Sequence, residues 1–194
     1  MSRYPKLDET TLSPAQQAIY DQIANGPRGH VVGPLRVWLQ SPGLAAKAQA
    51  LGQYARYESV LPPHLSELAI LVTARYWSSG FEWSHHAPIA LRAGVPADAI
   101  TAISQAKRFA FNDPSLQLVF DFAVELHLLK AVSDATYAAA LDAFGLQACV
   151  DLVGVCGYYT LISMTINTFD VPDGDGPVLP DLNIPLQDYF QAAR

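Results

Sequence analysis

The chain has 194 residues, of which 51% are hydrophobic and 15% are charged, and its formal net charge is −6. A chain of this length and apolar content can build one substantial core, which argues against a disordered protein. It has no run of Lys or Arg, so the composition argues against proteins that bind nucleic acid or an anionic membrane surface.

Helix-start signals recur along the sequence. Ser13-Pro14, Ser41-Pro42 and Asp113-Pro114 each place a capping side chain before a proline, and Ser133 opens a further helix. Between these signals apolar residues recur at helical spacing, whereas the β-branched runs are short. We therefore predict an all-α fold, a single-domain orthogonal bundle of seven or eight helices. Their expected ranges are 14–26, 42–58, 64–78, 80–93, 96–106, 114–130, 134–145 and 147–169.

The expected organisation has three parts. Residues 1–30 form an N-terminal arm with the first helix, residues 31–170 form the helical domain, and residues 171–194 form a Pro-rich C-terminal tail. Proline and glycine favour an extended tail, which is either a disordered end or a segment docked on the body or on a neighbouring subunit. Docking would bury its apolar residues, which are Val178, Leu179, Leu182, Ile184, Tyr189 and Phe190.

The segment Ala148–Phe169 is almost uncharged and is nearly as long as a membrane span. Its polar residues and the absence of flanking Lys or Arg favour a buried or subunit-interface helix instead. Gly154 and Gly157 would let another helix approach closely. We therefore expect no membrane span, and we expect a homo-oligomer.

Two cysteines, Cys149 and Cys156, are the only ones in the chain. On one helix their Cα atoms would lie roughly 10 Å apart, too far for a disulfide. They are better interpreted as buried apolar side chains. Because the N-terminus also shows no apolar signal segment, we expect a cytoplasmic protein.

The densest cluster of reactive side chains lies between Ser79 and His86. On a helix, Ser79, Glu82 and His86 form one stripe, and Glu82 and His86 are i,i+4 neighbours. A carboxylate beside an imidazole raises the pKa of the histidine, which then serves as an acid or base near neutral pH. Trp83 would exclude water from the pair. The alternative is a surface ion pair that contributes little.

Glu67 places one carboxylate in an otherwise apolar helical run, where it requires a partner. It pairs with Arg75, caps the helix after Pro62-Pro63, or faces the Glu82/His86 stripe. His85 and His86 point about 100° apart on a helix, so they do not suit one metal ion, and we expect no metal. No nucleotide or phosphate motif is present, and we expect no cofactor.

These residues resemble a known family. The matching runs are Leu65–Val72, Phe81–Ala90 and Gly94–Pro96, with Gly33–Arg36, Ser41-Pro42 and Val153–Asn167 on either side. They are similar to the core of the carboxymuconolactone decarboxylase / alkylhydroperoxidase-D-like superfamily over about residues 30–170. The resemblance implies an all-helical protein that acts without metal or cofactor and forms oligomers.

In the alkylhydroperoxidase-D-like branch, a glutamate is followed by the pattern C-x-x-C-x-x-x-H. Glu67 and His86 keep the glutamate and histidine positions here, but Ser79 and Glu82 stand where that branch has its cysteines. Without a thiolate there is no nucleophile for a peroxide. Cysteine-dependent peroxidase activity is therefore not expected.

The decarboxylase branch also has Glu and His at i,i+4, and it acts on a carboxylated lactone. By this resemblance we expect a lyase or isomerase for a small carboxylated or lactone-like metabolite. His86 would be the general acid/base, Glu82 would orient it and Glu67 would complete a relay. Arg36 or Arg75 would grip a substrate carboxylate, with Trp83 and Ser79 lining the substrate site.

Two other interpretations stay open. The protein could be a peroxidase-related detoxification protein that keeps the superfamily's pocket without its sulfur chemistry. It could also be a non-catalytic small-molecule-binding or assembly protein in which Glu82 and His86 are only a structural pair.

Overall fold

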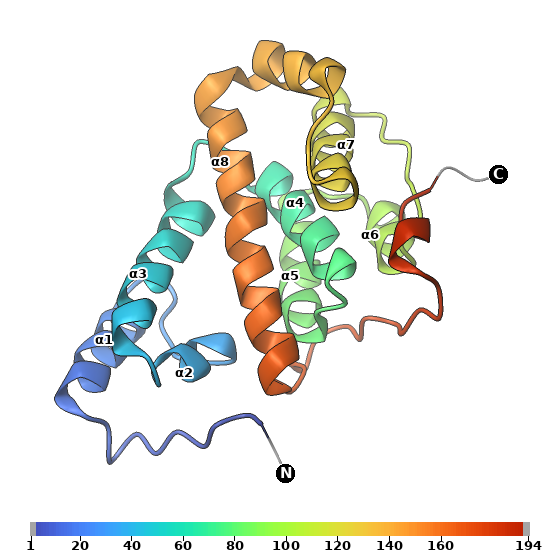
Figure 1. Ribbon diagram of the computed structural model, residues 1–194. Coiled ribbons are helices and arrows are strands. Elements are labelled where there is room, and N and C mark those ends of the chain that lie inside the picture. The colour runs from blue at the N-terminus through green and yellow to red at the C-terminus, as the bar shows by residue number, and fades with distance from the viewer. Residues whose placement is uncertain (1–2, 192–194) are drawn as a thin grey trace.

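The computed structural model describes residues 3–191, in which all regular secondary structure is helical (Figure 1). The α-helices are α1 (Pro14–Ala24), α2 (Pro34–Trp38), α3 (Pro42–Gln53), α4 (Pro63–Tyr76), α5 (Gly80–Ala93), α6 (Ala97–Ser104), α7 (Pro114–Leu129) and α8 (Asp134–Phe169). A π-helical turn, η1 (Tyr54–Glu58), follows α3, and a short 3₁₀ turn, η2 (Leu186–Asp188), lies in the tail. The predicted all-α fold is confirmed.

The core forms around α4. Every residue of this helix from Leu65 to Arg75 is buried, and α4 packs against α5, α7 and α8. A helix that is covered on all sides must be apolar on all sides, which explains why α4 shows so little amphipathic pattern. Two charged side chains, Glu67 and Arg75, are nevertheless buried in it, at 5% and 1% exposure. Both therefore require partners.

Helix α5 continues through Pro88, which leaves the carbonyl of Ser84 without its helical N–H donor. The C-terminal tail packs against this point. The Gly174 N–H donates to Ser84 Oγ at 3.1 Å. Gly176 lies so close that an added Cβ would come within 2.0 Å of the Ser84 carbonyl oxygen. The interrupted turn of α5 is thus covered by the tail.

Helix α8 bends sharply at Gly145, whose φ of 79° and ψ of 168° lie far from helical values. This bend is the boundary predicted between helices 134–145 and 147–169. Past the bend, the lone charge of the apolar segment, Asp151, is buried and accepts hydrogen bonds from the Tyr54 hydroxyl and the Val60 N–H, both at 2.9 Å. Asp151 thereby fixes η1 and the following loop against α8.

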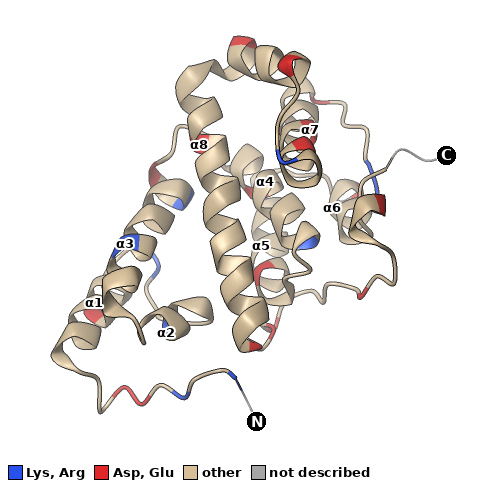
Figure 2. Ribbon diagram, in the orientation of Figure 1, with Lys and Arg blue, Asp and Glu red and all other residues tan. Residues whose placement is uncertain are grey.

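By length and composition alone, α8 is long and apolar enough to span a membrane. In its most apolar stretch of 18 residues, 39% is buried inside the molecule. One side of α8 packs on α2, α3, α4 and α7. Its only charged residues are Asp134, Asp142 and Asp151, so most of its length is tan in Figure 2. The opposite side exposes apolar side chains, which are Leu146, Val150, Val153 and Met164.

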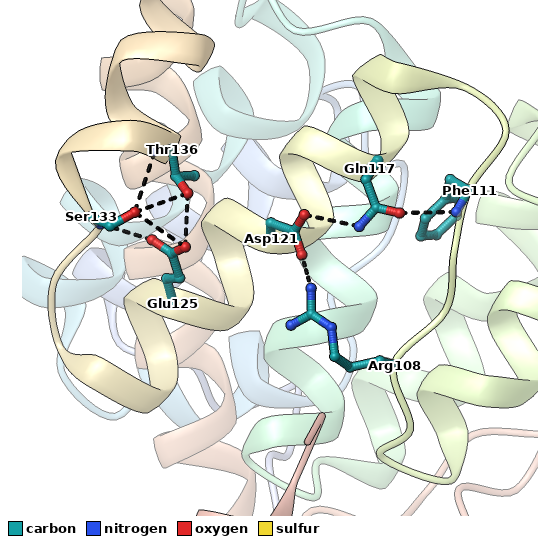
Figure 3. A network of polar contacts seen from close by, with 7 residues as sticks. All are labelled: Arg108, Phe111, Gln117, Asp121, Glu125, Ser133 and Thr136. Atoms are coloured by element: carbon teal, nitrogen blue, oxygen red, sulfur yellow. Dashed lines mark hydrogen bonds and ion pairs between the residues drawn. The ribbon is translucent and has the colours of Figure 1, made fainter. Parts of the chain in front are cut away.

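Helix α7 carries a polar network that fixes the segments on either side of it (Figure 3). Asp121 pairs with Arg108 and accepts from the Gln117 amide. Glu125 accepts from the Ser133 N–H and from the Thr136 hydroxyl, both at 2.7 Å, and so holds the first turn of α8. The network joins α7 to the segment before it and to the first turn of α8.

The tail is docked on the body, which is one of the two alternatives expected for this segment. Leu179, Tyr189 and Phe190 are buried, and the Phe190 N–H donates to the Ala106 carbonyl at 2.6 Å. Val178 and Ile184 stay exposed, so docking is selective.

Two local expectations were wrong. Residues 34–38, for which no helix was predicted, form α2, because Pro34 supplies the fixed φ that suits a first helical position. The helix predicted over 42–58 is α-helical only to Gln53 and then widens into η1. Widened turns of this kind are often found at functional sites.

Candidate functional site

The buried centre of the molecule holds an imidazole with a carboxylate at each ring nitrogen. His86 Nδ1 lies 2.7 Å from Glu67 Oε2, and His86 Nε2 lies 3.3 Å from Glu82 Oε2. The exposed fractions of His86, Glu67 and Glu82 are only 2%, 5% and 4%. We call these three residues the His86 triad.

The charges of the triad determine the protonation of His86. Burial by itself lowers its pKa, but the charge of Glu67 and the hydrogen bonds to Glu67 and Glu82 act in the opposite direction and prevail, so its pKa is raised. With both nitrogens protonated, His86 donates one N–H to each carboxylate. The favoured state is therefore an imidazolium between two carboxylates.

Helix packing brings the triad together. Glu67 lies in the second turn of α4, and Glu82 and His86 lie on α5, which turns back along α4 after residues 77–79. Tyr159 of α8 closes the third side, with its ring edge-on to His86 at a centroid distance of 5.0 Å. Glu67 thus reaches His86 from another helix, across 19 residues of sequence.

A cavity of about 270 Å³ opens beside the triad. Its polar and charged lining residues are Arg28, His30, Arg56, Tyr57, Glu82, His85, His86 and Tyr159, and its apolar walls are Pro27, Val32, Pro34, Leu35 and Phe81. Glu82 and His86 face this cavity, whereas Glu67 lies behind the imidazole. The volume is at the small end of the range for ligand sites.

The two arginines expected to grip a carboxylate lie elsewhere. Arg36 pairs with Glu9 at 3.0 Å and donates to the Leu7 carbonyl, so it holds the N-terminal arm. Arg75 points to the tail, where it donates to the carbonyls of Ser104 and Pro180 at 3.1 and 2.7 Å. The geometry therefore corrects both expectations, because each guanidinium is already engaged outside the cavity.

Trp83 and Ser79 also lie outside the cavity lining. Trp83 lines a separate apolar cavity of about 360 Å³ between α5 and α6. Ser79 is fully buried as the N-cap residue of α5, and its hydroxyl has no hydrogen-bond partner among the described residues. Of the expected site residues, Glu67 and Glu82 contact His86, whereas Trp83 lies on the other side of α5.

Sequence reasoning missed Arg28, Arg56 and Tyr159. Arg28 lies in the loop between α1 and α2, and Arg56 lies in η1. No periodic pattern marks a loop arginine, and the widened turn that directs Arg56 into the cavity has no sequence signature. Tyr159 lies in the Val153–Asn167 run of the resemblance, which assigns it no role in the site.

The cysteines are remote from this chemistry. Neither Cys149 nor Cys156 lines the cavity, and burial raises the pKa of Cys156 to about 12. A thiol so difficult to ionise is a poor nucleophile. Among residues 3–191, no three His, Cys, Asp or Glu side chains cluster in a way that would hold a metal ion.

Comparisons with known proteins agree with the fold. Residues 42–125 match the carboxymuconolactone decarboxylase family. No curated protein matches the chain. Among solved structures, an uncharacterized peroxidase-related protein from Silicibacter sp. TM1040 is 14% identical with a TM-score of 0.70, over 88% of this chain and 90% of that one.

A second solved structure is a cysteine-to-alanine variant of the debrominase Bmp8 in complex with 2,3,4-tribromopyrrole. It is 13% identical, with a TM-score of 0.68, over 87% of this chain and 90% of that chain. At this identity the two structures establish a shared fold and no more. The family match covers residues 42–125 and the two structures share the fold, so the comparisons support the predicted resemblance to the carboxymuconolactone decarboxylase / alkylhydroperoxidase-D-like superfamily.

Proposed function

We propose that the protein is a cofactor-independent lyase or isomerase for a small carboxylated or lactone-like metabolite, with the His86 triad as its acid/base group. The observation that carries the proposal is a buried imidazole at the wall of a cavity, with a carboxylate at each ring nitrogen. A purely structural ion pair needs no cavity. A proton-transfer site needs one, because the substrate must reach the proton donor.

The positions of the two carboxylates suggest different roles. Glu67 lies behind the ring with the shorter contact, so it orients His86 and keeps it protonated. Glu82 faces the cavity beside Nε2 and is the group that would accept a proton from substrate carbon. This assignment differs from the roles expected from sequence, in which Glu82 orients His86 and Glu67 completes a relay.

In the proposed reaction, the substrate carbonyl oxygen takes the place of Glu82 as acceptor of the His86 Nε2–H bond. In an isomerase, Glu82 removes the proton from the neighbouring carbon, the electron pair moves into the carbonyl, and the proton returns at another carbon. In a lyase, a carboxylate on that carbon leaves as CO₂, the electron pair of the broken carbon–carbon bond moves into the same carbonyl, and the carbon then takes a proton that His86 delivers and solvent replaces. Positioned acid/base groups contribute about 10²–10⁴ to such rates.

The proposal predicts exchange of substrate C–H with solvent. The protein is incubated in D₂O with a panel of small keto acids and carboxylated lactones, and deuterium incorporation is followed by NMR. We expect one class of compounds to exchange with the native protein and to exchange about 10²–10⁴ times more slowly with His86→Gln. His64→Gln, which replaces a histidine outside the cavity, is the matched control.

The competing interpretations give different results. A peroxidase-related protein would consume a hydroperoxide, for which no cysteine lines the cavity. A non-catalytic binding protein would bind compounds of the panel without exchanging any of their protons. Exchange that persists in His86→Gln would reject the proposed role of His86.

A further inference from the structure

The cavity lining includes two arginines that have no carboxylate partner among the described residues. Arg28 and Arg56 both line the cavity, and neither forms an ion pair with any carboxylate in residues 3–191. Arg28 donates one hydrogen bond, from Nη2 to the Tyr158 hydroxyl at 3.1 Å, while its buried Nε has no partner at all. A buried guanidinium N–H without an acceptor is costly unless a ligand supplies one.

Neutral side chains hold both guanidiniums in place. Tyr158 holds Arg28, and Gly52 leaves room for this contact because it has no side chain. An added Cβ there would lie 2.0 Å from the Tyr158 hydroxyl and 2.5 Å from Arg28 Nη2. Burial raises the pKa of Tyr158 to about 12, so this hydroxyl stays neutral and does not neutralise Arg28.

Arg56 is held in a similar way by His85. Arg56 Nη2 lies 3.2 Å from His85 Nε2, and burial, together with the charges of His86 and Arg56, lowers the pKa of His85 to about 4. His85 is therefore neutral at physiological pH, with the Nε2 lone pair free to accept. Arg28 and Arg56 thus both line the cavity, and each is held by a neutral partner.

The charge balance of the cavity indicates the ligand. The His86 triad carries one negative charge, because its two carboxylates exceed its single imidazolium. The two arginines carry two positive charges, so the whole site is left with one positive charge. One monoanion would neutralise it, and a carboxylate offers oxygen acceptors that match guanidinium N–H donors.

We propose that Arg28 and Arg56 form an anion anchor that binds the carboxylate of a small monocarboxylate substrate and directs the rest of the molecule to His86 and Glu82. The inference rests on the proposed function for what happens at His86, whereas the anchor itself is a binding site. It replaces Arg36 and Arg75 in that role. His85 and Tyr158 act through the arginines as positioning residues.

The anchor also restricts the chemistry. Guanidiniums stabilise a carboxylate more than they stabilise neutral CO₂, so they would oppose loss of the group they hold. The anchored carboxylate is therefore not the leaving group. A substrate held by its only carboxylate has no carboxylate to lose as CO₂, so the anchor favours the isomerase of the proposed function. The substrate class is a monocarboxylate whose reacting carbonyl or lactone lies next to His86.

The anchor is tested with acetate, levulinate and phenylacetate, each against its neutral amide, by titration calorimetry and by NMR of the arginine Nε–H signals. We expect the carboxylates to bind and to shift the Arg28 Nε–H signal, and the amides to bind much more weakly. In Arg28→Met or Arg56→Met, carboxylate binding should weaken about tenfold to a hundredfold. Arg92→Met removes a charge from an exposed position of α5 and should bind like the native protein.

The outcomes separate this inference from the proposed function. His86→Gln should retain carboxylate binding while losing proton exchange. Carboxylate binding without any exchange would support the anchor and contradict the acid/base role. Equal binding of carboxylates and amides, absence of binding by all three carboxylates, or unchanged binding in both arginine variants would overturn the anchor. Circular dichroism and thermal unfolding confirm that each variant is folded, and Arg56→Lys should recover part of the affinity.

Discussion

His86 on α5 and Glu67 on α4 are joined by a contact of 2.7 Å between Nδ1 and Oε2 in the interior of the protein. The contact links the two most closely packed helices, and it places a fixed negative charge behind the imidazole. The acid/base role proposed for His86 depends on this arrangement, because the ring nitrogen that faces Glu82 and the cavity is the other one, Nε2.

Glu67→Gln keeps the shape of the side chain and removes its charge. We expect the pKa of His86 to fall, because the largest favourable contribution to its charged form is lost. The rate of proton exchange on an identified substrate should fall about 10²-fold, and its pH profile should shift to lower pH. The measurement is exchange rate against pH, with Glu58→Gln as an exposed control. An unchanged pH profile would mean that Glu67 does not determine the protonation of His86.

The pH dependence of stability should be governed partly by His127. Burial and the charge of Lys130 lower its pKa to about 4, so folding favours its neutral form. This contribution is complete above the ordinary pKa of 6.5 and is lost as the pH falls towards 4. It amounts to about 3 kcal/mol of unfolding free energy by pH 4.

His127→Gln should therefore flatten the loss of stability between pH 6.5 and pH 4, as measured by urea unfolding at a series of pH values. His64→Gln should leave this loss of stability unchanged. His86 acts in the opposite direction: its pKa is raised, so its contribution is complete below pH 6.5 and is lost as the pH rises through the folded-state value. A His127→Gln protein with the native slope would contradict the assignment.

Much of this fold was predictable from sequence, because the helices begin at prolines with capping side chains. Ser13, Asp113 and Ser133 cap their helices as expected, and the break near residue 145 was also expected. The widened turn η1 was not, because it depends on tertiary contacts of Tyr54 and Val60 with Asp151. Local patterns do not encode such contacts.

The candidate site was predictable only in part. The spacing of Glu82 and His86 identified their pairing, since both lie on one helix. The pairing of Glu67 with His86 depends on how α4 packs on α5, and the arginines that face the cavity come from a loop and from η1. Arg36 and Arg75 were expected there only because they are charged residues near the motif.

The bend in α8 should depend on Gly145. At φ 79° and ψ 168° a Cβ is strained, so Gly145→Ala should lower the unfolding free energy by about 1–3 kcal/mol. Gly43→Ala, in a helical turn with open space around it, should be neutral or stabilising by up to about 1 kcal/mol. Thermal unfolding compares the two. Equal effects of the two substitutions would show that the bend carries no backbone strain.

Docking of the tail should depend on Gly176. A Cβ at this position would come within 2.0 Å of the Ser84 carbonyl oxygen, so Gly176→Ala should displace the tail from α5. Limited proteolysis should then cut more rapidly between residues 171 and 191. Gly43→Ala again serves as the control, and native-like protection of the tail in Gly176→Ala would contradict the prediction.

Self-association should depend on the exposed stripe of α8. Val150 and Val153 are 61% and 48% exposed on one side of an almost uncharged helix, and apolar surface of this kind favours association. Light scattering after size exclusion should show an oligomer of the native chain and a smaller species for Val150→Lys. Val178→Lys, on the tail, should leave the mass unchanged. A monomeric native chain would contradict the expected homo-oligomer.

The most direct test of the account is a ¹⁵N NMR titration of the His86 ring in the native protein, with and without levulinate. We predict that both ring nitrogens remain protonated above pH 6.5, because Glu67 and Glu82 each accept one N–H, and that bound levulinate perturbs the Nε2 signal more than the Nδ1 signal. A ring that titrates at or below pH 6.5 and does not respond to levulinate would contradict both the acid/base role of His86 and its place beside the bound substrate.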